Sequence, residues 1–136
     1  MKTFRPLLSW IMLLSIISLF SCGKDEYLKS EAGIKKQLNG SWNLVPIPRT
    51  APDQLWTFSD ESFSRMQGST SYDGTYTVNT TMFKAEIKVE NMPIVSGERN
   101  YNGTWQIVRL DKDFLIIVND GDGTTGITEL EFTKKQ

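Results

Sequence analysis

Two pairs of acidic residues in this chain are the best candidates for a catalytic site, because each pair is closely spaced. Asp60 and Glu61 are adjacent, and Asp111 and Asp113 are two residues apart. Paired carboxylates can divide general acid and base roles in glycosidase-type hydrolysis if an apolar pocket raises the pKa of one of them. Both pairs fall in short polar segments between apolar runs, where acidic residues commonly form turns. We therefore interpret them as turn formers and predict that the chain is not an enzyme.

The composition excludes other classes of site. The 136 residues include no histidine, which excludes histidine-dependent catalytic sets and histidine-ligated metals. The single cysteine excludes an intrachain disulfide and a Cys-x-x-Cys site. Residues 120–124 with Glu131 imitate a calcium loop, but Thr125 occupies the position that requires glycine, so we predict a hairpin turn there and neither a metal nor a cofactor. The net charge of -1 shows no excess of basic residues of the kind that nucleic-acid binding requires.

The cysteine, Cys22, directly follows a short apolar segment. Residues 7–20 are predominantly apolar and come after Lys2 and Arg5. A helix of that length is about 21 Å long, shorter than the roughly 30 Å hydrocarbon core of a bilayer, so the pattern predicts a secretory signal. Residues 19–22, Leu-Phe-Ser-Cys, resemble the lipobox of bacterial lipoproteins. The resemblance implies that residues 1–21 are removed and that acyl chains on Cys22 anchor the protein to a membrane.

The residues after this cysteine predict a location and a tether. Cys-Gly-Lys-Asp-Glu at 22–26 resembles the export signal of surface lipoproteins of Bacteroidota. This resemblance implies the outer membrane of the cell envelope, with the periplasmic and the outward-facing leaflet left as alternatives. Residues 22–30 are polar and predict a flexible tether that spans at most about 30 Å. We expect one domain at 31–136.

The domain is predicted to begin with a short helix and to continue as strands. Ser30 is a suitable N-cap, Ile34 and Leu38 are four residues apart, and Asn39-Gly40 is a stop signal, which together predict one or two helical turns. After Gly40 the apolar residues alternate with polar ones. Eight short strands are expected, at 41–45, 55–58, 62–67, 74–78, 82–90, 104–110, 114–119 and 127–134.

The predicted connections between these strands alternate in length. They are two or three residues long after the second, fourth and sixth strands. They are longer after the odd strands, at 46–54, 68–73, 91–103 and 120–126. In an up-and-down antiparallel meander, alternate connections lie at opposite ends. We therefore expect a cup, with a closed end formed by tight turns and an open end surrounded by long loops.

Three short motifs at predicted strand starts support a barrel. Gly40-Ser41-Trp42 resembles the Gly-x-Trp signature of the lipocalins, and the segments at 74–76 and 103–105 repeat it as in lipocalin-like lipoproteins of Bacteroidota. The resemblance implies an eight-stranded up-and-down barrel in which Gly40 and Trp42 seal the closed end and a basic side chain stacks over Trp42. By alternation, Arg109 or Lys134 could supply that side chain.

Alternation also predicts an interior and an exposed rim. The expected interior residues are Leu44, Phe58, Tyr76, Val78, Phe83, Ala85, Ile87, Val89, Trp105, Ile107 and Phe132. A barrel of this size is either filled by side chains or holds one small ligand, and the sequence leaves both open. Trp56, Tyr72, Tyr101 and the apolar run 92–95 are expected at the open rim. The candidate contacts with a ligand or partner are Trp56, Tyr72, Tyr76, Met92, Ile94, Tyr101 and Trp105.

Two functions are compatible with this reading. The first is a lipid-anchored, lipocalin-like binding protein that takes a small apolar or amphipathic ligand into the barrel. The alternative is a solid barrel whose loops dock onto another envelope protein or a glycan. Because the tether enters beside Trp42, the closed end should face the membrane and the rim residues should point into the medium.

Overall fold

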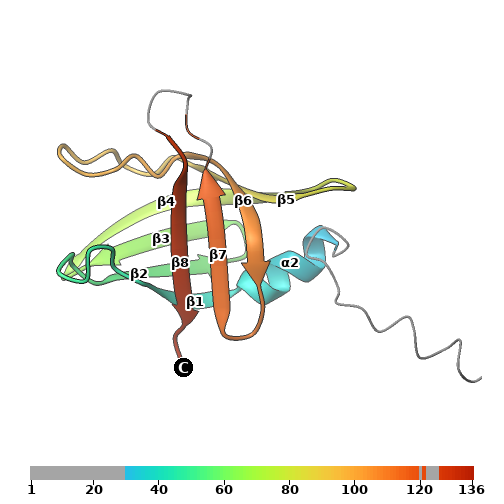
Figure 1. The fold of residues 1–136 in the computed structure, drawn as a ribbon, viewed down its shortest axis with the longest axis horizontal. Helices are drawn as coiled ribbons and strands as arrows, with labels where there is room; N and C mark the ends of the chain where they lie inside the picture. Colours follow the sequence, from blue (N-terminus) through green and yellow to red (C-terminus); the bar gives the residue numbers. More distant parts are fainter. Residues whose placement is uncertain (1–29, 120, 122–125) are drawn as a thin grey trace, which may run out of the picture.

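The computed structural model describes residues 30–119, 121 and 126–136 (Figure 1). The predicted signal segment, Cys22 and all but one residue of the segment 120–125 lie outside the described residues. The described chain forms a short helix and eight strands. These are α2 (Glu31–Leu38), β1 (Gly40–Leu44), β2 (Gln54–Ser59), β3 (Ser62–Gln67), β4 (Thr70–Thr80), β5 (Ala85–Glu90), β6 (Gly103–Leu110), β7 (Phe114–Asn119) and β8 (Thr128–Lys134).

The strands close into a barrel. Each strand pairs antiparallel with the next one along the chain, and β1 pairs with β8 to complete the circle. In that last pairing Trp42 lies opposite Lys134. Directly opposed residues share a face of the sheet, so these two side chains are brought together by register alone. The predicted all-β, eight-stranded up-and-down barrel with a short helix before it is confirmed.

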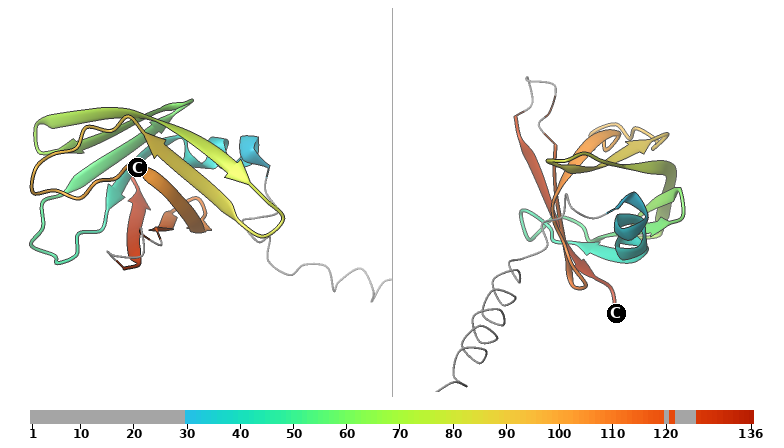
Figure 2. Two further views of the ribbon diagram at one scale, coloured as in Figure 1. Left: turned by 90° about the horizontal axis from the view of Figure 1, so that it is seen from above. Right: turned by 90° about the vertical axis from the view of Figure 1, so that its right-hand side faces the viewer.

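Helix α2 lies across one end of the barrel (Figure 2). Its first turn is capped by Ser30, whose hydroxyl oxygen accepts a hydrogen bond from the Gly33 amide at 3.1 Å. Ile34 and Leu38, four residues apart, are fully buried. The helix contacts β4 and β6. Its apolar stripe therefore plugs the closed end, where the β2–β3, β4–β5 and β6–β7 turns also lie.

The open end differs from the prediction at one connection. The expected long loop at 68–73 is a two-residue turn, because β4 begins at Thr70 rather than at Gly74. Residues 70–73 pair with residues 64–67 of β3. This part of β4 is polar and mostly exposed, so it lacks the apolar alternation that marks the other strands. The remaining long connections are 45–53, 91–102 and 120–127.

Two residues predicted to point inward do not. Phe83 lies in the β4–β5 turn and is 81% exposed, because hydrogen bonds to Thr81 close this turn before β5 begins at Ala85. Arg109 follows a β-bulge between Ile107 and Arg109. The bulge inserts one extra outward residue, so Val108 and Arg109 are both exposed and Leu110 returns to the core.

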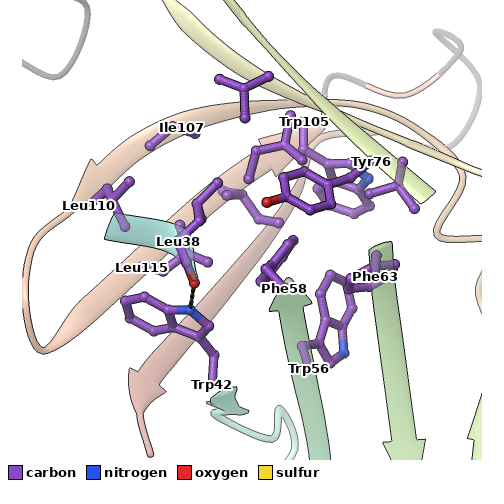
Figure 3. Packing of buried hydrophobic residues seen from close by; sticks show 14 of the residues in the cluster. Leu38, Trp42, Trp56, Phe58, Phe63, Tyr76, Trp105, Ile107, Leu110 and Leu115 are labelled. Carbon is purple, nitrogen blue, oxygen red and sulfur yellow. Dashed lines mark hydrogen bonds between the residues drawn. The ribbon is translucent and has the colours of Figure 1, made fainter. Parts of the chain in front are cut away.

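Large side chains fill the barrel interior (Figure 3). The Trp56 ring lies 5.0 Å from Phe63, 5.2 Å from Tyr101 and 4.8 Å from Phe132, measured between ring centroids. Phe58 links this group to Tyr76 at 5.1 Å. Trp56, Phe58 and Phe132 are all fully buried, so these contacts leave the interior packed by side chains. Of the two alternatives left open above, the structure has the filled barrel.

Candidate binding site at the open end

At the closed end, Trp42 and Lys134 join the helix to the barrel. Trp42 is fully buried, and its indole N–H donates a 2.7 Å hydrogen bond to the Leu38 carbonyl (Figure 3). The Lys134 ammonium lies 4.1 Å from the centroid of the Trp42 ring. Lys134 Nζ also donates to the carbonyl of Asn39 at 2.6 Å. The basic residue on Trp42 is therefore Lys134, which ties β8 to the end of α2.

Two further features belong to the contact between Lys134, Trp42 and the end of α2, which we call the closed-end joint. Gly40 has φ +112°, and a Cβ there would lie 3.1 Å from Lys134 Nζ, so the position requires glycine both for its backbone and for the close approach. Burial lowers the pKa of Lys134 from its usual value. Arg109, the other candidate, stacks on Phe114 at 4.6 Å and donates to the Asp111 carboxylate at 2.8 Å on the outside of the barrel.

The acidic pairs lie in turns, as predicted from their surroundings. The Asp111 carboxylate accepts hydrogen bonds from the amides of Asp113 at 2.9 Å and Phe114 at 2.8 Å. The hydrogen bond from the Asp113 amide is the largest cause of a lowered pKa of Asp111. Burial opposes it, and the Phe114 amide and Arg109 lower the pKa further. Asp60 and Glu61 form the exposed β2–β3 turn. Asp60 and Glu61 line a hollow with Lys35, Lys36, Asn39 and Tyr76, so among the described residues their surroundings are mainly charged and polar.

A buried arginine occupies the open end. Arg65 on β3 is 1% exposed, although its neighbours in the barrel are aromatic. Its guanidinium lies 4.5 Å from the Tyr72 ring and 4.9 Å from the Tyr101 ring. Cation–π contacts of this kind offset part of the cost of burying a charge. Two tyrosines predicted at the rim are therefore brought together by an inward-pointing cation.

Hydrogen bonds hold the same guanidinium in place. Its Nη2 donates to the Glu98 carboxylate at 2.6 Å, and its Nη1 donates to the Gln67 side-chain oxygen at 2.9 Å. The Nε of Arg65 is buried and has no hydrogen-bond partner among the described residues. Glu98 belongs to the loop 91–102, which we call the mouth loop. The ion pair therefore fastens the mouth loop to β3.

The mouth loop folds onto the end of the barrel. Met92 and Tyr101, near its two ends, are buried. The Asn102 side chain joins the two ends, since it accepts from the Met92 amide and donates to the Met92 carbonyl, each at 2.8 Å. The Trp105 indole donates to the Tyr101 carbonyl at 3.0 Å. These contacts make the loop a closure over the mouth and not an open rim.

The prediction that Trp56, Met92 and Tyr101 point into the medium is therefore wrong. Trp56 is fully buried beneath Tyr101, and its indole N–H donates to the Gln54 side-chain oxygen at 3.3 Å. Gln54 in turn donates to the Tyr101 hydroxyl at 3.4 Å. Trp56 lies two residues from Phe58 on the same face of β2, so alternation places it inward. Met92 and Tyr101 are buried by the folding back of the mouth loop, which local alternation cannot reveal.

The most exposed large apolar residues at the open end are three isoleucines. Ile47 is 79% exposed, Ile94 is 70% exposed and Ile127 is 76% exposed, each on a different connection. Ile47 and Ile127 line a shallow hollow of about 410 Å³ together with Arg99 and Tyr101. A larger hollow of about 910 Å³ lies elsewhere, over polar residues of β5, β6 and the mouth loop.

The remaining candidate contacts lie apart from this hollow. Trp105 is buried in the core. Tyr76 lies deeper, toward the closed end; burial, followed by Asp60 and Glu61, raises the pKa of its hydroxyl. That hydroxyl has no hydrogen-bond partner among the described residues. Sequence reasoning missed Arg65 and Glu98. Alternation in Ser62–Gln67 gave a usable signal, because Arg65 shares the face of Phe63.

Comparisons with known proteins add no family. The chain matches no family model, and neither the curated proteins nor the solved structures gave a match. Within residues 30–119, 121 and 126–136, no helix is long and apolar enough to cross a membrane. The same residues contain no group of three or more acidic or cysteine side chains that could hold a metal ion.

Proposed function

We propose that this protein is a lipid-anchored, non-catalytic component of the bacterial cell envelope whose open end binds another envelope protein. The observation that carries the proposal is the filled interior beneath a closed mouth loop. A barrel packed in this way offers its outer surface for binding. The anchor itself rests on the lipobox resemblance at Cys22.

The exposed isoleucines favour a protein as the partner. Ile47, Ile94 and Ile127 have no polar atom in their side chains, so they gain only from burial against another apolar surface. Complete burial of such a side chain contributes about 1.5–3 kcal/mol. Glycans offer hydroxyl-rich surfaces that call for polar and aromatic contacts instead. Loops are usually polar, so three exposed isoleucines at one end support a docking surface.

Site-specific photo-crosslinking in living cells tests this proposal. A photoreactive amino acid replaces Ile94 or Ile47 at the open end, and Val108, which is 55% exposed on the outer wall, as the control. We expect one discrete protein adduct from Ile94 and from Ile47, and none from Val108. Equal adducts from all three positions, or none at the open end, would contradict the proposal.

A second candidate function is supported by Arg65. This cation is buried beneath the mouth loop, and its Nε lacks a partner among the described residues. A small amphipathic ligand with an anionic group could replace Glu98 on the guanidinium if the mouth loop opened. The aromatic side chains below would then have to rearrange, which is why we place this function second.

A further inference from the structure

We propose that the β4–β5 turn is a second membrane contact, which inserts Met82 and Phe83 into the interfacial layer of the bilayer to which Cys22 is anchored. We call residues 81–84, Thr-Met-Phe-Lys, the hairpin tip. This inference rests on the lipid anchor of the proposed function but is independent of what binds at the open end.

The hairpin tip exposes two large apolar side chains side by side. Met82 is 76% exposed and Phe83 is 81% exposed, and neither belongs to the buried core. Tight turns normally carry glycine, asparagine, aspartate or serine, because these residues suit the backbone and remain hydrated. Folding of the barrel therefore does not explain a methionine and a phenylalanine at these two positions.

The backbone of the hairpin tip is fixed. The Thr81 amide donates to the Lys84 carbonyl at 2.8 Å. The Thr81 hydroxyl oxygen accepts from the amides of Phe83 at 3.3 Å and Lys84 at 3.2 Å. Below the turn, Thr80 pairs with Ala85. The two apolar side chains are thus presented on a preformed support, so little backbone entropy would be lost on insertion.

The hairpin tip lies at the end of the barrel where the tether enters. In Figures 1 and 2 the β4–β5 hairpin projects past the barrel on the side where α2 begins. The described chain starts at Ser30, immediately before that helix. Seven residues lie between Cys22 and Ser30, so the extended chain between the two spans at most about 28 Å. An acylated Cys22 therefore keeps this end of the barrel close to the bilayer surface.

The neighbouring charges suit a lipid surface better than a purely apolar partner. Lys84, at the end of the hairpin tip, is half exposed and its ammonium pairs with the Glu86 carboxylate at 2.6 Å, and Lys36 is exposed on α2 at the same end. Segments that lie in the membrane–water interface commonly combine lysine with aromatic and aliphatic residues. The ammonium lies among the lipid headgroups, and the apolar side chains lie below it. The occupant we assign to the hairpin tip is thus the headgroup region of the anchoring membrane.

Fluorescence depth measurement tests this assignment. The full chain, isolated in its lipid-anchored form, is labelled with an environment-sensitive fluorophore in the variants Phe83→Cys and Ile94→Cys. Both positions are highly exposed, but they lie at opposite ends. The proteins are placed in vesicles of phosphatidylcholine and phosphatidylglycerol containing nitroxide-labelled lipid. We expect a blue-shifted emission and severalfold stronger quenching at position 83 than at position 94. Equal quenching at both positions, or emission at 83 typical of water, would overturn the assignment.

A second measurement places the label outside the hairpin tip, so that the tip itself can be changed. A water-soluble maleimide is reacted with Asp60→Cys at the closed end, with and without Met82→Ser and Phe83→Ser. Loss of the apolar pair should accelerate labelling severalfold, whereas the control pair Ile47→Ser and Ile94→Ser should not. An unchanged rate would contradict the inference. Failure of the anchor itself is recognised separately, because the unaltered chain would then not sediment with vesicles and its own Cys22 would react.

Discussion

At the scale of single residues, the closed end depends on one lysine. Lys134 Nζ combines the contact with the Trp42 ring at 4.1 Å and hydrogen bonds to the carbonyls of Asn39 at 2.6 Å and Gln37 at 3.3 Å. These carbonyls belong to the last turn and the C-cap of α2, where the helix dipole favours a cation. One ammonium group therefore joins the helix, β1 and β8.

Replacing this lysine should destabilise the fold. Lys134→Met keeps most of the apolar stem but removes the charge, so we expect a loss of about 1–3 kcal/mol in the free energy of unfolding. Lys135→Met, at the exposed neighbouring position, is the control and should change it by less than about 0.5 kcal/mol. Urea unfolding of both variants measures the difference. Similar values for the two would show that the closed-end joint does not depend on Lys134.

The acid stability of the β6–β7 turn should depend on Asp111. Hydrogen bonds from the backbone and from Arg109 lower the pKa of this carboxyl group in the folded protein. Its contribution to stability is therefore complete above the unfolded pKa of about 3.9 and is lost as the pH falls through the lower folded value. Asp111→Asn should therefore lower the free energy of unfolding at pH 7. Near pH 2 the effect should be smaller, because the Asp111 carboxylate is then largely protonated and contributes less.

The neighbouring Asp113 provides the comparison for that prediction. Its carboxylate faces the exposed Lys112 at 3.7 Å. Asp113→Asn should leave the urea midpoint almost unchanged at either pH, because exposed pairs of this kind contribute little. If Asp111→Asn and Asp113→Asn showed the same pH dependence, the backbone hydrogen bonds would not be its cause.

At the scale of elements, local alternation of apolar and polar residues predicts most strands. The arrangement of the open end depends on contacts between residues distant in sequence. β5 and most of β6 are recognisable because apolar and polar residues alternate in them, and β7 is recognisable as a short continuous apolar run. The start of β4 was missed because residues 70–73 contain a single large apolar side chain, Tyr72, and so show no alternation. Arg109 was misplaced because a bulge changes the parity and leaves no mark in composition. The burial of Tyr101 depends on the folding back of the mouth loop, which pairs residues distant in sequence.

The ion pair between Arg65 and Glu98, which fastens the mouth loop, should contribute more to the free energy of unfolding than the ion pairs on the surface. Glu98→Gln leaves the buried Arg65 guanidinium without its carboxylate, and we expect a loss of about 1–3 kcal/mol. Amide hydrogen exchange in residues 92–101 should accelerate at the same time. The control is Glu90→Gln, which breaks the half-exposed pair with Lys88 and should cost less than about 1 kcal/mol.

The two variants separate a fastened loop from a merely packed one. Faster exchange confined to the mouth loop in Glu98→Gln, with Glu90→Gln unchanged, is the expected pattern. If exchange in the loop were the same in both variants, the loop would be held by Met92 and Tyr101 alone, and the ion pair would not close the mouth.

At the scale of the whole molecule, the two ends of the barrel differ in what they expose. The closed end carries α2, the start of the described chain and the hairpin tip with Met82 and Phe83. The open end carries three exposed isoleucines, two of which, Ile47 and Ile127, line a shallow hollow. In our proposal the first end faces the anchoring membrane and the second faces a protein partner. The barrel between them is a solid spacer and not a container.

Native mass spectrometry of the protein purified from its membranes tests this central claim most directly. If the interior is filled, the folded protein should have the mass of the acylated chain from Cys22 onward, and that mass should not change when the protein is denatured. A small molecule that accompanies the folded chain and is lost on unfolding would contradict the filled barrel. It would place the function in the interior instead of at the open end.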